Sequence, residues 1–131
     1  MNSLETAIKN AINSNGGKEE INKAYLEFLK ANFIIPIEKE LHNGEPIVLY
    51  LHENEEIYLP VFSNIKHFDQ WAKEIREHIQ LLKLSGVDLL KGIGDNITVC
   101  LNPASEIYKT FDPTEIARLK GMVLKLFKDA S

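Results

Sequence analysis

Two stretches of this chain decide its fold: Leu59-Pro60-Val61-Phe62-Ser63-Asn64 and Val99-Cys100-Leu101-Asn102-Pro103-Ala104-Ser105. Each begins with apolar residues in the pattern of a half-buried β-strand, and each then runs into a short polar segment. The first polar segment opens a region of helical spacing that carries the only tryptophan, Trp71. The second precedes a final helix with a well-marked start. The two stretches therefore predict strands that end in polar loops.

Upstream of the first stretch, the spacing of apolar residues predicts two helices joined by a short turn. Ser3 is expected to cap the first helix, and Asn15-Gly16-Gly17 to end it, because glycine adopts the left-handed conformation at little cost. The second helix is expected to begin near Lys18. Residues 1–31 are therefore predicted to form an αα-hairpin. The apolar residues that carry the helical spacing are Leu4, Ala7, Ile8, Ala11, Ile12, Ile21, Ala24, Tyr25, Phe28 and Leu29.

The period then changes to that of extended chain. Residues 33–37 and 47–51 are predicted strands, with a polar loop over 38–46 between them. Pro36 lacks an N–H and therefore indicates a sheet edge or a strand end, an edge that would leave homodimerisation open. Residues 57–61 alternate on one face and are expected to form an antiparallel hairpin with the preceding strand.

In the second half of the chain, Asn64 is expected to cap a helix whose apolar stripe runs to Ile75. Residues 79–84 and 97–101 are predicted strands, with a short helical turn near residues 85–90. Asp112-Pro113-Thr114-Glu115 is a strong helix start, with Asp112 as the cap and Glu115 reaching back in a capping box. The buried stripe of that last helix is expected to include Ile116, Leu119, Val123, Leu126 and Phe127.

This order of elements predicts a mixed α/β (α+β) fold, in which helices pack on a mainly antiparallel sheet. Residues 1–131 are expected to form a single domain. The net charge of −4 argues against nucleic acid or an anionic membrane as a partner, because both attract basic surfaces. No apolar run is long enough for a membrane span. A lone cysteine and the absence of a secretory signal at the start of the sequence favour the cytoplasm.

Few residue patterns point to catalysis. The four histidines form no pair with metal-ligand spacing, and the glycines match no phosphate-binding loop, so neither a metal nor a cofactor is expected. Cys100 falls inside a predicted strand, where a free cysteine usually acts as a small buried hydrophobe. Paired with a histidine it would be a candidate nucleophile. The histidines are His42, His52, His67 and His78.

Five segments in this order resemble the SseB-like N-terminal domain family: residues 59–63, 68–71, 86–90, 101–105 and 112–115. The resemblance covers roughly residues 25–131. Ser63 stands where threonine is usual, and Ala104 where glycine is usual, although alanine resists a positive φ. The resemblance implies a bacterial, cytoplasmic, non-enzymatic module of poorly defined role, whose family name is linked to serine sensitivity and a neighbouring sulfurtransferase. It implies no catalytic residues.

These observations lead us to expect a non-catalytic protein-interaction module. Its candidate partner surface comprises Phe62, Ser63, Asn64, Asn102, Pro103 and Ser105. Residues 102–105 also have a purely structural interpretation as a tight turn, and Trp71 is either core or a partner anchor. One alternative is a small-ligand binder or weak enzyme with a pocket near Trp71 and Cys100. A further alternative is an immunity or chaperone-like protein that neutralises a toxin or effector.

Overall fold

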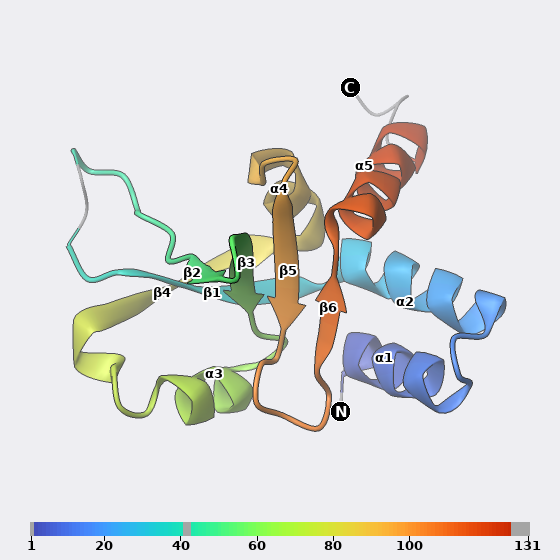
Figure 1. Cartoon of the computed structure of the whole chain (residues 1–131), viewed down its shortest axis with the longest axis horizontal. Helices are drawn as coiled ribbons and strands as arrows, with labels where there is room; N and C mark the ends of the chain where they lie inside the picture. Colours follow the sequence, from blue (N-terminus) through green and yellow to red (C-terminus); the bar gives the residue numbers. More distant parts are fainter. Residues whose placement is uncertain (1, 41–42, 127–131) are drawn as a thin grey trace.

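A computed structural model describes residues 2–40 and 43–126 of the chain (Figure 1). Helices and strands are interspersed along the sequence, which confirms the mixed α+β class. In chain order the elements are α1 (Ser3–Asn13), α2 (Lys18–Lys30), β1 (Asn32–Glu38), β2 (Leu51–Glu53), β3 (Glu56–Val61), α3 (Ile65–Ala72), the 3₁₀ helix η1 (Arg76–His78), β4 (Ile79–Ser85), α4 (Gly86–Gly92), β5 (Ile97–Leu101), β6 (Lys109–Phe111) and α5 (Pro113–Leu126). No described helix is long and apolar enough to cross a bilayer.

The strands form two sheets. β1 pairs with β4 in an antiparallel two-stranded sheet, and the larger sheet has the order β2-β3-β5-β6. The central pair of the larger sheet, β3 and β5, is parallel, with Leu59 opposite Val99. The other pairs in the larger sheet are antiparallel. Because β3 and β5 run the same way, the polar segments that follow them emerge at the same edge of the sheet.

The predicted strand over residues 47–51 is wrong in its extent. Only its last residue, Leu51, belongs to β2, and Val48 makes an isolated bridge to Ile37 of β1. The hairpin with β3 is present but shorter than expected. It closes through Asn54 and Glu55, both at positive φ, as in the two-residue turns that suit the twist of a hairpin.

Pro36 lies within β1, opposite Leu81 of β4. Its carbonyl accepts a hydrogen bond from the Leu49 N–H on the side away from β4, and Ile34 exchanges two 2.9 Å bonds with Phe62 on that same side. The backbone nitrogen of Pro36, which has no hydrogen to donate, therefore faces the side of β1 that makes only isolated contacts. The hydrogen-bond ladder between β1 and β4 loses no donor. These contacts already occupy part of the edge that the sequence pattern left open for homodimerisation.

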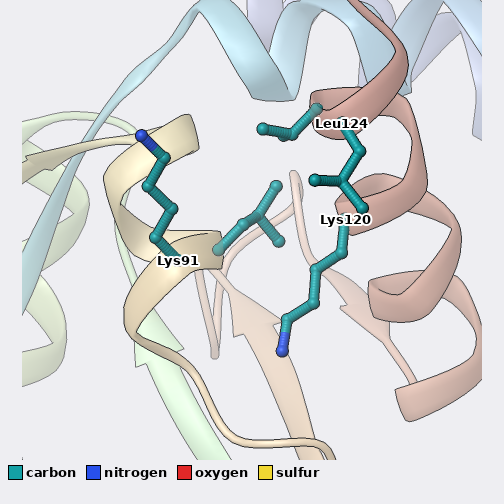
Figure 2. Close-up of a pocket in the computed structure, with 5 residues that line it drawn as sticks. Lys91, Lys120 and Leu124 are labelled. Atoms are coloured by element: carbon teal, nitrogen blue, oxygen red, sulfur yellow. The ribbon is translucent and has the colours of Figure 1, made fainter. Parts of the chain in front are cut away.

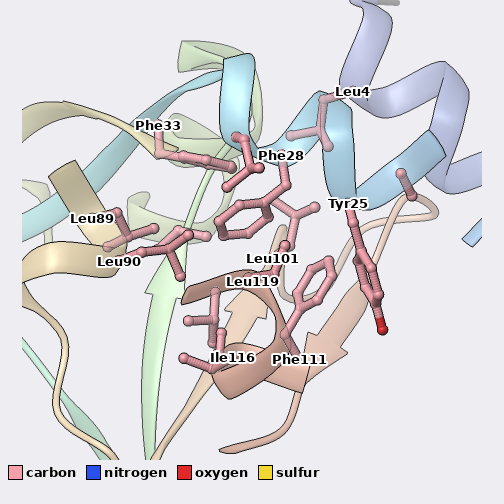
Figure 3. Close-up of a cluster of buried hydrophobic side chains, with 14 of the residues drawn as sticks. Leu4, Tyr25, Phe28, Phe33, Leu89, Leu90, Leu101, Phe111, Ile116 and Leu119 are labelled. Atoms are coloured by element: carbon pink, nitrogen blue, oxygen red, sulfur yellow. The ribbon is translucent and has the colours of Figure 1, made fainter. Parts of the chain in front are cut away.

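The main core lies between the larger sheet and helices α1, α2, α4 and α5 (Figure 3). The Phe28 ring lies at its centre, 4.7 Å from the Phe33 ring and 5.1 Å from the Phe111 ring between centroids. A smaller cluster forms where α3 packs on Phe62, whose ring meets the Phe68 ring edge-on. The apolar stripes that predicted the helices are thus the surfaces that bury them.

The helices differ from the sequence expectations at two points. Asn2, not Ser3, caps α1, since its side chain accepts the Glu5 N–H. α3 ends at Ala72, before Ile75, and both Ile65 at its start and Ile75 beyond its end are exposed instead of belonging to an apolar stripe. The helical hairpin itself is confirmed, with Gly16 at a φ of 82° in the turn.

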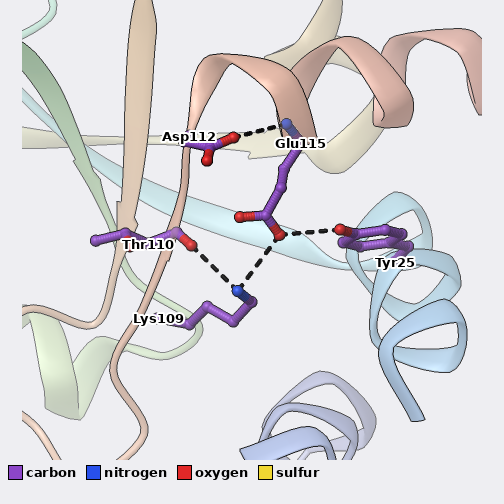
Figure 4. A network of polar contacts seen from close by, with 5 residues as sticks. All are labelled: Tyr25, Lys109, Thr110, Asp112 and Glu115. Atoms are coloured by element: carbon purple, nitrogen blue, oxygen red, sulfur yellow. Dashed lines mark hydrogen bonds and ion pairs between the residues drawn. The ribbon is translucent and has the colours of Figure 1, made fainter. Parts of the chain in front are cut away.

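The start of α5 is capped on one side only. Asp112 accepts the Glu115 N–H at 2.9 Å, but the Glu115 carboxylate does not return to Asp112 (Figure 4). It accepts a 2.9 Å hydrogen bond from the Tyr25 hydroxyl and lies 3.4 Å from the Lys109 ammonium. Burial and the bond to this carboxylate raise the pKa of Tyr25 to about 12. Glu115 therefore joins α5 to α2 and β6. The expected stripe residue Phe127 lies outside the described residues.

Candidate functional site

The polar segments after β3 and β5 are bound to each other through Asn102. Its side-chain oxygen accepts the Ser63 N–H at 3.0 Å, and its amide nitrogen donates to the Ser63 Oγ at 2.9 Å. Its backbone N–H also donates to the Val61 carbonyl. Asn102 is fully buried. The two loops that the sequence singled out are thus one structure, locked by a single amide side chain.

A buried carboxylate ties the first of these loops, the one after β3, to α1. Glu5 is only 2% exposed, and its Oε1 accepts hydrogen bonds of 2.7 Å from both Ser63 Oγ and Asn64 Nδ2. The side chain of Asn2 donates to the Ser63 carbonyl. Glu5 lies in the first turn of α1, where the helix dipole favours a negative charge. These hydrogen bonds compensate for much of the cost of burying the carboxylate.

The sequence analysis missed Glu5. Its signal was available, because Asn2 and Glu5 have the spacing of a helix cap followed by an acidic residue three positions later. That pattern usually marks an exposed helix start, where the acidic side chain bonds back to the cap. Here the carboxylate turns instead toward residues 58 and 59 positions away in the sequence.

Beside this network the surface is hollowed by a polar groove, which we call the loop groove. Its volume is about 700 Å³, and it runs between the first turns of α1 and α3 and the loop that follows β5. The Nδ1 atom of His67 is buried and has no hydrogen-bond partner among the described residues. The lining residues are Asn2, Glu5, Asn64, Lys66, His67, Gln70, Ala104, Ser105, Glu106 and Ile107.

The structure divides the six candidate surface residues into two groups. Phe62 and Asn102 are fully buried, and Ser63 is nearly so, which makes these three the support of the loops. Asn64 and Ser105 line the loop groove, whereas Pro103 is partly exposed beside it. The buried residues Phe62, Ser63 and Asn102 therefore serve to hold the loops in place. Only the outer residues of the loops remain candidates for contact with a partner. Neither group includes Lys66 or Glu106, which also line the groove.

The turn after Asn102 keeps a left-handed backbone despite the alanine. Ala104 has a φ of 66° and Asn102 a φ of 50°. Asparagine tolerates this region, but the Cβ of alanine is disfavoured there. The Asn102 side-chain bonds and the backbone bond from Ser105 to Asn102 hold the turn in this shape. The turn is thus left-handed although an alanine occupies position 104.

Trp71 and Cys100 do not share a pocket. Trp71 is partly exposed and packs on Phe62 at 5.2 Å between ring centroids. Cys100 is 7% exposed in β5, opposite Pro60 and Thr110, and burial raises the pKa of its thiol. Neither residue lines any of the five best-formed pockets over residues 2–40 and 43–126. These positions give no support to the small-ligand alternative.

The histidines are also dispersed. His52 lies in β2, His67 in α3 and His78 in η1, whereas His42 falls outside the described residues. Over the part of the chain that the structure describes, no three His, Cys, Asp or Glu side chains gather as a metal site would require.

Comparison with known proteins gives one match. The family model described as "SseB protein N-terminal domain" matches residues 4–118. The match begins earlier than the resemblance found in the sequence, so the helical hairpin of α1 and α2 belongs to the family pattern, and it stops within α5. No curated protein and no solved structure matches the chain.

Proposed function

Since the chain belongs to the SseB N-terminal domain family, we propose that it is a non-catalytic protein-interaction module whose contact surface is the loop groove. The observation that carries the proposal is the contrast between the base of the groove and its rim. The base is held by buried hydrogen bonds among Glu5, Ser63 and Asn102. The rim presents polar side chains of both signs, including Lys66 and Glu106.

This arrangement suits recognition of another protein. Loops held by a rigid scaffold are where binding residues concentrate, because their outer side chains meet a partner without further ordering of the backbone. The groove lies beyond the ends of the parallel pair β3 and β5, and open parallel α/β sheets commonly bind ligands at the corresponding edge. We also place the protein in a bacterial cytoplasm, on the strength of the family resemblance and of its lone cysteine.

The test begins with affinity capture of the tagged protein from its native cytoplasm, followed by calorimetry with the purified partner. We expect Lys66→Glu to weaken partner binding at least about tenfold, since it reverses a charge on the rim. Lys83→Glu is the matched control, because Lys83 is exposed on β4 and lies outside the pockets described above. Equal losses for both variants, or none for Lys66→Glu, would show that the partner binds elsewhere.

Substitutions at the outer loop positions refine this test. Ser105→Arg would place a bulky cation in the groove and remove the hydroxyl that accepts the Ile107 N–H, so we expect it to reduce affinity and to lower the melting temperature slightly. A partner encoded beside this chain and known as a toxin or effector would favour the immunity or chaperone-like function. Recovery of the protein alone would count against the interaction module and would direct the work to ligand screening by thermal shift.

A further inference from the structure

A second surface hollow lies between α4 and α5, away from the loop groove (Figure 2). We call it the α4–α5 groove; it is lined by Leu90, Lys91, Lys120, Val123 and Leu124. Leu90 and Val123 are buried and provide its apolar interior. Leu124 is 73% exposed, the highest value among the large apolar side chains of the described residues. Leu124 therefore extends the apolar interior of the hollow, formed by Leu90 and Val123, out to the protein surface.

The rim of this groove is basic in a chain whose net charge is −4. Lys91 projects from α4 and Lys120 from α5, one on each side of the apolar residues (Figure 2). The Lys120 ammonium is fixed by a 2.8 Å bond to the Ile93 carbonyl, and its neighbour Asp95 is 96% exposed. Asp95 offsets part of the charge of Lys120, although an exposed pair of this kind contributes little free energy. Lys91 forms none of the ion pairs found among residues 2–40 and 43–126.

The size of the groove limits its occupant. Its volume of about 270 Å³ lies at the lower end of the roughly 300–1,000 Å³ typical of small-molecule sites, and it is open to solvent, so it encloses a ligand only partly. That space accepts an apolar side chain from a partner, as in the recognition of an amphipathic helix by a hydrophobic groove. Lys91 and Lys120 favour an acidic helix, because carboxylates next to the inserted apolar side chain would lie close to the two ammonium groups.

We propose that the α4–α5 groove docks an acidic amphipathic helix of a partner protein. One apolar side chain of that helix enters between Leu90 and Leu124, and a carboxylate one turn away pairs with Lys91. The α4–α5 groove and the loop groove share no lining residue, so binding at one can be tested independently of binding at the other. A second copy of this chain in the same groove is the competing occupant, and the experiment below distinguishes the two.

The experiment uses a displayed library of amphipathic helical peptides of about 16 residues, each with two fixed leucines four positions apart and random polar positions. Peptides are selected on the full-length protein, resynthesised with fluorescein and measured by fluorescence anisotropy. We expect the enriched peptides to carry Asp or Glu next to the leucines and to bind more weakly at higher salt. Enrichment of neutral or basic peptides, or no enrichment, would overturn the proposal.

Variants locate the binding. Leu124→Asp should weaken the selected peptides at least about tenfold, and Lys91→Glu about fivefold, as expected for one exposed ion pair. Leu26→Asp is the matched control, because Leu26 is an exposed leucine of α2 outside the described pockets. Binding that survives both groove variants would overturn the proposal. So would a dimer, seen by sedimentation, that Leu124→Asp dissociates. If Leu124→Asp perturbs folding, the test relies on Lys91→Glu, which changes an exposed side chain.

Discussion

The hydroxyl of Ser63 donates a 2.7 Å hydrogen bond to the buried carboxylate of Glu5, which joins the loop after β3 to the first turn of α1. Both side chains are nearly inaccessible to solvent. A buried polar pair of this kind costs free energy when one partner is removed, because the other is left without a hydrogen bond. The loop groove therefore depends on an interaction that lies beneath it.

We expect Glu5→Ala to lower the free energy of unfolding by about 3 kcal/mol, because Ser63 and Asn64 both lose their acceptor. Glu5→Gln keeps an oxygen at this position and should cost about 1 kcal/mol. The measurement is urea unfolding followed by the fluorescence of Trp71. Glu74→Ala, at an exposed position, should have no effect. A Glu5→Ala protein as stable as the wild type would mean that the network contributes little to stability.

Ala104→Gly should stabilise the protein by up to about 1 kcal/mol. Alanine is strained at a φ of 66°, and glycine relieves that strain, although the greater freedom of glycine in the unfolded chain offsets part of the gain. Ala117→Gly is the opposite control, since Ala117 is exposed within α5 and glycine there should cost about 1 kcal/mol. Thermal unfolding of both variants checks the pair. A destabilised Ala104→Gly would show that the turn is not strained.

Gly86→Ala should destabilise the protein by about 3 kcal/mol or prevent folding. A methyl group at Gly86 would lie 2.0 Å from the Phe28 carbonyl oxygen, and a backbone atom there cannot move aside as a flexible side chain would. Gly92→Ala is the matched control in the same helix, because no atom lies within 4 Å of the added carbon. Circular dichroism and urea unfolding should show Gly92→Ala close to the wild type. Equal stability of the two variants would refute the close packing of α4 on α2.

Stability should fall as the pH rises from about 10 to 12, and Tyr25 should account for part of this fall. The pKa of Tyr25 is about 12 in the folded protein, above the value of about 10 expected for an unfolded chain. The folded state therefore holds the proton more tightly, and the resulting stabilisation is fully present below pH 10 and lost above it. Tyr25→Phe should flatten this part of the pH profile, whereas Tyr50→Phe, at an exposed position, should leave it unchanged.

The Cys100 thiol should react slowly with iodoacetamide at neutral pH, at least about tenfold below its rate in the urea-unfolded chain. Burial raises its pKa, so little thiolate forms, and the side chain is hardly exposed. Mass spectrometry of the alkylated protein measures the rates. A fast native reaction would restore the case for a nucleophilic cysteine.

Much of the fold could be predicted because its signals are local. The caps at Asn64 and Asp112 and the apolar stripes of the helices lie within a few residues of the elements that they determine. The strand β6 could not be predicted, because it has only three residues and forms only through its hydrogen bonds to β5. Three residues are too few to show the alternating pattern of a strand. The reverse holds for residues 47–50, which have strand-like composition but find only isolated contacts on β1.

The site was predicted only in part for a similar reason. Polar loops after two strands are visible in the sequence, and the structure places them together. Their burial is not visible, because it depends on the parallel register of β3 with β5 and on a carboxylate from α1. Asn102 therefore resembled a surface residue in the sequence, although it is fully buried. The residues exposed in the groove, such as Lys66, had no distinguishing pattern.

The parallel pairing of β3 with β5 sets the order in which the chain acquires its structure during synthesis. β3 ends at Val61, but β5, its parallel partner, is complete only when Leu101 has left the ribosome. The Phe28 ring can pack against the Phe111 ring only after a still longer stretch of chain has been synthesised. In a nascent chain of intermediate length, α1 and β2 can already contact α2 and β3, but the apolar surfaces that later pack against β5 and β6 stay uncovered, since long-range pairings close last. Chaperones that recognise exposed apolar segments would meet this protein before its last helix is made.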